Sequence, residues 1–182
     1  MIVNYLFSAS LVLYAISALL YSLMFYKSPE KIEKYSFLSL LAGIGAHSVS
    51  LIFRTAKSGH VPVTNMFESL SFFSWTCVLI FLIFRARYGV KILGAFVAPF
   101  VLALMLYAST MPMKIVPIEP VLRSPWLPLH AVSAFFGNGF LAMAFLAGVM
   151  YLIQEDRIKK KKVPGKIFLM LPSLDMLDKL GY

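Results

Sequence analysis

Long apolar runs separated by short polar segments dominate the pattern of residues along the chain. An apolar stretch of about 18 or more residues with few charges is typical of a helix that crosses a bilayer. The pattern therefore predicts an all-α, polytopic membrane helix bundle with about five transmembrane helices, in a membrane domain of residues 1–156. The predicted spans cover residues 3–26, 35–53, 66–84, 92–110 and 126–153.

Three of these runs carry further information. The first has no charge and no basic segment before it, which favours a retained anchor over a cleaved signal peptide. Pro99, near the middle of the fourth, predicts a kink. The fifth is too long for one simple span, so its first turn, with Trp126 and Pro128, is expected in the membrane interface, where tryptophan is favoured.

Composition and charge agree with a multi-pass membrane protein in contact with lipid. Of the 182 residues, 60% are hydrophobic and 14% are charged, whereas soluble domains have about a quarter of their residues charged. The net charge of +9 does not indicate a nucleic-acid partner, because the basic residues lie at the ends of the apolar runs. Cys77 is the single cysteine and lies inside such a run, so we expect a small core residue and no redox pair.

The basic residues also predict the orientation. With the N-terminus outside, the inner segments carry three basic residues before the second run, three after the third, and six between Arg157 and Lys166, against four in the outer loops. Residues 157–182 then form a basic cytoplasmic tail, followed by an interfacial helix or linker too short to span. The loop of residues 54–64 and the start of the fifth run share the outer face.

A dense polar motif meets an apolar run at residues 58–75, which read SGHVPVTNMFESLSFFSW. Part of it predicts a capped helix start: Asn65 would accept from free backbone N–H groups, and Glu68 would reach back toward the cap. Pro62 would keep the preceding loop extended, and Gly59 would supply a turn. His60 lies outside this account and is either a metal or haem ligand or a solvated polar residue.

The other two histidines also lie near the predicted outer face. His47 is seven residues before Arg54, about 10 Å below the outer end of its span at 1.5 Å per residue. An ionisable residue at that depth indicates a functional position. An interhelical hydrogen bond to a hydroxyl is favoured there over haem ligation. His130 heads a stripe on one helical face, with Gly137 beside it, where small residues allow close approach of a flat ring or another helix. The stripe continues through Ala134, Asn138 and Ala142.

Two segments resemble the system II cytochrome c biogenesis proteins, the CcsA/ResC haem-handling family. Residues 58–75 match the family pattern G-H-x-P-x-x-N-x-[YF]-E-S-L-x-F-x-x-W, which ends at Trp75. Residues 122–136, LRSPWLPLHAVSAFF, are similar to the family's S-x-W-L-x-x-H-V segment. In the family that histidine is an axial ligand to haem iron at the outer surface, and His130 matches its position, with Trp126 just before it.

The resemblance implies a haem-handling component of cytochrome c biogenesis, which delivers and presents non-covalent, b-type haem in transit to apocytochrome c. It also implies a membrane partner of the ResB/CcsB type and a place in the bacterial inner membrane, or in the thylakoid membrane of a plastid. His60 and His47 are further candidate haem-binding residues. The alternative, from another class, is a non-haem polytopic module with a structural or interaction role.

One part of the family pattern is missing from the chain. The family's tryptophan-rich segment, with a W-G-x-Y-W-x-W-D-P-K-E core, is absent, and the chain has two tryptophans. We therefore interpret residues 1–182 as an N-terminal half, for which a complementary C-terminal half is an expected partner. The family acts in haem attachment of the haem lyase type, and whether this chain is itself an enzyme stays open.

Overall fold

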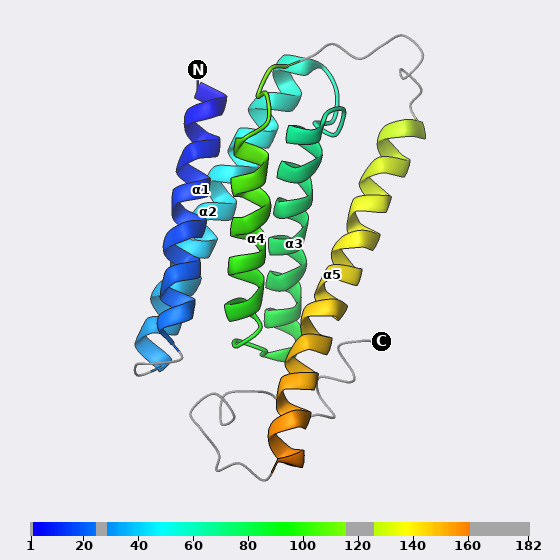
Figure 1. Ribbon diagram of the computed structural model, residues 1–182. Helices are drawn as coiled ribbons and strands as arrows, with labels where there is room; N and C mark the ends of the chain where they lie inside the picture. Colours follow the sequence, from blue (N-terminus) through cyan, green and yellow to red (C-terminus); the bar gives the residue numbers. More distant parts are fainter. Residues whose placement is uncertain (1, 25–28, 116–125, 161–182) are drawn as a thin grey trace.

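The computed structural model describes residues 2–24, 29–115 and 126–160, and this part of the chain is helical with short connections. The helices are α1 (Ile2–Leu23), α2 (Pro29–Ser58), α3 (Met66–Tyr88), α4 (Gly94–Ser109) and α5 (Trp126–Lys159). Four are long and apolar enough to cross a membrane, and α4, with 16 residues, is shorter. The predicted all-α membrane bundle of about five helices is therefore confirmed (Figure 1).

Several helices extend beyond the apolar runs that predict them. α2 begins at Pro29 and ends at Ser58, so most of the expected loop of residues 27–34, and Arg54 with it, is helical. Proline is well suited to the first helical turn, and charged side chains mark a membrane boundary without ending a helix. α3 continues to Tyr88 and ends at Gly89, whose φ of 69° is the left-handed conformation that glycine adopts readily.

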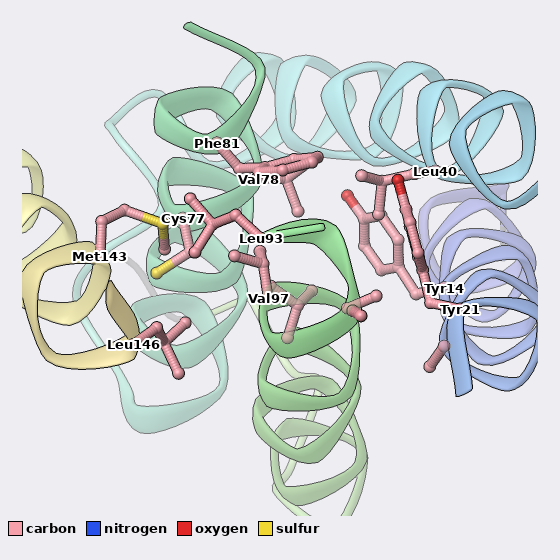
Figure 2. Close-up of a cluster of buried hydrophobic side chains, with 14 of the residues drawn as sticks. Tyr14, Tyr21, Leu40, Cys77, Val78, Phe81, Leu93, Val97, Met143 and Leu146 are labelled. Atoms are coloured by element: carbon pink, nitrogen blue, oxygen red, sulfur yellow. The ribbon is translucent and has the colours of Figure 1, made fainter. Parts of the chain in front are cut away.

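The helices pack around one apolar core, with α3 and α4 at its centre, α1 and α2 on one side and α5 on the other. α1 packs against α2 and α4, while α3 packs against α4 and α5. Figure 2 shows side chains of α3 and α4, such as Val78 and Val97, between Met143 of α5 and Tyr14 of α1. Cys77 is fully buried in this cluster, as expected of a small core residue.

All five helices place one terminus at the same end of the bundle. This end holds the start of α1, the end of α2, the start of α3, the end of α4 and the start of α5 (Figure 1). We call it the motif end, because it carries residues 58–68. Toward this end α5 leans away from α3, and its opposite half lies closer to the bundle (Figure 1). The topology therefore brings the motif and the start of α5 to one face.

Candidate functional site

The start of α3 is capped as the sequence predicts. Asn65 has extended backbone angles, φ −134° and ψ 169°, and its side-chain oxygen accepts a hydrogen bond of 2.9 Å from the backbone N–H of Glu68. Gly59, just after α2, has a φ of 74° and supplies the predicted turn. The motif loop is thus fixed at both ends by local backbone chemistry.

Glu68 reaches back as expected, but to a different residue and with a second partner. One carboxylate oxygen accepts from the backbone N–H and the hydroxyl of Thr64, at 3.0 and 2.8 Å, one position before the cap. The other oxygen accepts from Nε of Arg54 at 2.8 Å. Both side chains are buried, with 2% of Arg54 and none of Glu68 exposed. The ion pair is a finding of the structure, because the sequence indicates Arg54 only as an outer-loop charge.

Arg54 also binds the segment that follows α4. Its two terminal nitrogens donate to the backbone carbonyls of Met113 and Lys114, at 3.1 and 3.0 Å. The guanidinium carbon lies 4.7 Å from the ring centroid of Phe67 on α3. We call Arg54, Thr64, Glu68 and the carbonyls of residues 113 and 114 the Arg54 network. It joins α2, the motif loop, α3 and the exit of α4 at the motif end.

His47 is fully buried between three helices, and hydroxyls engage both ring nitrogens. Nδ1 lies 3.3 Å from the Tyr14 hydroxyl on α1, and Nε2 lies 2.8 Å from the Ser71 hydroxyl on α3. A neutral imidazole offers one donor and one acceptor, which these two hydroxyls can match. The interhelical hydrogen bond that the sequence favours at this position is therefore present, and His47 makes two of them, one to α1 and one to α3.

An apolar cavity of about 470 Å³ lies between the end of α2, the motif loop and α3. Four motif residues line it, Val61, Pro62, Phe72 and Trp75, and the indole N–H of Trp75 donates to the Ser48 hydroxyl at 2.8 Å. Its other lining residues, all on α2, are Ser48, Leu51, Ile52, Thr55 and Ala56. His60 precedes this lining segment, and its Nδ1 lies 2.9 Å from the Val61 carbonyl. Residues from both halves of the motif thus form one wall of this cavity.

His130 and Trp126 lie on the exposed start of α5, where 74% of the Trp126 side chain is accessible. Two turns further along the same stripe, Asn138 lines a groove of about 290 Å³ between α3 and α5. The groove's other lining residues are Met66, Ser69, Leu70, Phe73 and Phe135. A Cβ atom added at Gly137 would meet no atom of the described residues within 4 Å. Helix packing among these residues therefore leaves the small residue at Gly137 unexplained.

The structure places the three histidines in three different settings. His47 is in the core, His60 is in the motif loop, and His130 is on the surface of α5. Within residues 2–24, 29–115 and 126–160, no three His, Cys, Asp or Glu side chains form a group able to hold a metal ion. Of the three, His130 is the exposed imidazole on the helix that also supplies Phe135 and Asn138 to the groove.

Comparison with known proteins identifies relatives along the whole chain. A family model described as Cytochrome C assembly protein matches residues 63–182. Protein HemX of Brevibacillus brevis is 28% identical over 99% of this chain and 66% of its own length. The cytochrome c biogenesis protein CcsA of Chlamydomonas reinhardtii is 30% identical over 70% of this chain and 38% of its own length. CcsA of Synechococcus sp. (strain CC9311) is 30% identical over 78% of this chain and 48% of its own length.

The chain spans 38% to 66% of the length of these three curated relatives. No solved structure matches the chain. The matched region includes the end of the motif, the helices α3 to α5 and His130.

Proposed function

Because the chain belongs to the cytochrome C assembly protein family, we propose that it is a haem-handling membrane component of cytochrome c biogenesis. In this role it holds non-covalent haem in transit and presents it to apocytochrome c. The observation that supports the proposal is that His130 is exposed on α5 at the motif end, on the same helix as Phe135 and Asn138, which line the groove between α3 and α5.

The residues around the groove have distinct proposed roles. His130 supplies a nitrogen donor to the iron, and Phe73 and Phe135 offer an apolar wall. Trp126 lies in the interface and shields one side of the site. Bound haem would supply an iron that accepts an imidazole nitrogen and vinyl groups that accept thiols. Asn65 and Glu68 act on this site indirectly, by fixing the start of α3: Asn65 Oδ1 accepts from the Glu68 backbone N–H, and the two Glu68 oxygens accept from Thr64 and Arg54.

We also propose the orientation and the partners. The N-terminus and the motif end lie outside, in the bacterial inner membrane or in the thylakoid membrane of a plastid. A subunit of the ResB/CcsB type, a complementary C-terminal half and apocytochrome c are the proposed protein partners. The support is the distribution of basic residues and the family membership of the chain.

An absorption spectrum of the purified protein, expressed with and without a complementary C-terminal half, tests the proposal. We expect a Soret band that is strongest with both halves and that His130→Ala removes. Leu141→Ala is the matched control, because Leu141 lies on α5, is 69% exposed and does not line the groove, so the band should survive that change. Mature cytochrome c formed by residues 1–182 alone would contradict the proposed dependence on a second half.

The second candidate function is a non-haem module with a structural or interaction role. Its support is that hydroxyls engage both ring nitrogens of His47 and that the Asn65 and Glu68 side chains have partners within the chain. A folded protein with no Soret band, even together with the complementary half, would favour this candidate over the first.

A further inference from the structure

We propose that Arg54 is a positioning residue, which fixes the exit of α4 to the start of α3 and thereby limits where the start of α5 can lie. Its three side-chain nitrogens donate to three separate acceptors: a Glu68 carboxylate oxygen and the carbonyls of Met113 and Lys114. These acceptors come from two segments far apart in the sequence, and α2 supplies the arginine. The consequence for His130 rests on the proposed haem function.

The geometry needs an arginine and not merely a positive charge. A guanidinium presents several N–H donors in a rigid plane, whereas a lysine ammonium is a compact charge on a flexible stem. A lysine at position 54 could keep the ion pair with Glu68, but it could not reproduce the fork that binds two successive carbonyls. Arg54→Lys therefore separates charge compensation from positioning.

The burial of the ion pair also indicates that Arg54 has a positioning role. Removing two charges from water costs free energy that their attraction often fails to recover, so a buried pair is weak evidence of stability by itself. The carbonyls of Met113 and Lys114 lie beyond the last turn of α4, and Arg54 supplies a hydrogen-bond donor to each. Arg54 therefore does more than neutralise Glu68, because it satisfies and holds the backbone at the exit of α4.

Holding this backbone affects the next helix in the chain. That helix is α5, which begins at Trp126 and carries His130. Arg54 holds the backbone at residues 113 and 114, so 11 residues (115–125) separate the held backbone from Trp126, against 16 (110–125) from the end of α4. A shorter stretch of chain reaches less far, so the hydrogen bonds of Arg54 limit how far from the motif the start of α5 can lie.

The experiment measures thiol labelling in purified protein, so that its result is independent of membrane orientation. A cysteine replaces Met113, which is half-buried, in a Cys77→Ser background. With Arg54→Lys, we expect the cysteine at position 113 to react at least about tenfold faster with a maleimide, the factor for losing one charge-assisted hydrogen bond. The His130-dependent Soret band should weaken or shift in the same variant.

Arg85→Lys is the matched control at the opposite end of the bundle. Arg85 pairs with Glu33 and lies 3.7 Å from the ring centroid of Phe37, both on α2, so this change should leave labelling at position 113 as in the parent. If Arg54→Lys does not fold, the double change Arg54→Met with Glu68→Leu replaces the pair by apolar side chains, which is often tolerated. It too should expose position 113.

The outcomes separate the two proposals. Unchanged labelling at position 113 in Arg54→Lys, or in the apolar double variant, would overturn the positioning role whatever the haem spectrum shows. Faster labelling with an unaltered Soret band would overturn the link from Arg54 to His130. If the parent protein shows no Soret band at all, the haem function fails while the labelling result still decides whether Arg54 holds the exit of α4.

Discussion

Replacing Glu68 by alanine should destabilise the protein far more than removing the Asn65 cap. The change removes the only acidic partner found for Arg54 among the described residues, while the guanidinium stays 98% buried. Breaking a buried ion pair by removing one partner costs about 3–5 kcal/mol of folding free energy. Loss of an N-cap side chain costs about 1 kcal/mol. We therefore expect a difference of about 2 kcal/mol or more between Glu68→Ala and Asn65→Ala.

The assay is reversible unfolding of the purified protein in mixed micelles, with the free energy of unfolding compared among variants. Ser69→Ala is the matched control: it lies next to Glu68 on α3 and loses only a 3.3 Å hydrogen bond to the Val63 carbonyl. It should cost less than about 1 kcal/mol. The reasoning is refuted if Glu68→Ala and Asn65→Ala cost the same, since the carboxylate would then not be compensating a buried guanidinium.

Three further predictions test other parts of the structure. A cysteine at Ser58 should react with an impermeant thiol reagent from outside and one at Val163 should not; reversed labelling would contradict the proposed orientation. His47→Ala should cost about 1–3 kcal/mol, because it removes two interhelical hydrogen bonds and leaves buried hydroxyls unmatched; an unchanged unfolding free energy would show that those bonds contribute nothing. Gly94→Ala should cost about 1–3 kcal/mol, because its Cβ would lie 2.5 Å from the Tyr21 ring; an equal cost for alanine at Gly137, where a Cβ has room, would disprove this steric reason.

The sequence predicts the helices and the local motif better than it predicts their long-range partners. Apolar run length indicates each helix, and the Asn65 cap follows from residue spacing alone. The ion pair between Arg54 and Glu68 joins different helices, and no spacing rule connects a helix end with a residue beyond the next loop. The contact of Arg54 with residue 113 is more distant still, because it requires α4 to return to the motif end.

The helix ends and the partners of the histidines are further features that the sequence does not predict fully. Helical hydrogen bonding continues past the apolar residues, so α2 and α5 are longer than the predicted runs. The hydroxyls that engage His47 come from α1 and α3, and polar residues buried among apolar neighbours leave no mark in a hydropathy pattern. The predicted haem-binding residues His130, His60 and His47 stay predictions until a spectrum of the protein tests them.

α5 packs closely against the bundle in its second half and is more exposed at its start, so a change in the second half can move the start. At Gly139 an added Cβ would lie 2.6 Å from the Ile80 side chain, so the backbone of α5 lies directly against that side chain of α3. Beyond that point, away from the motif end, Met143 and Met150 are fully buried, while Trp126 at the other extreme is exposed. Nearer the motif end, the Phe135 ring still contacts α3, with its centroid 5.4 Å from that of Phe72. His130 lies five residues beyond this contact, about 7.5 Å along the helix axis, so a tilt of about 10° about Phe135 moves it by about 1.3 Å. A bulkier residue at Gly139 would push α5 away from Ile80 and thereby shift His130 without contacting it.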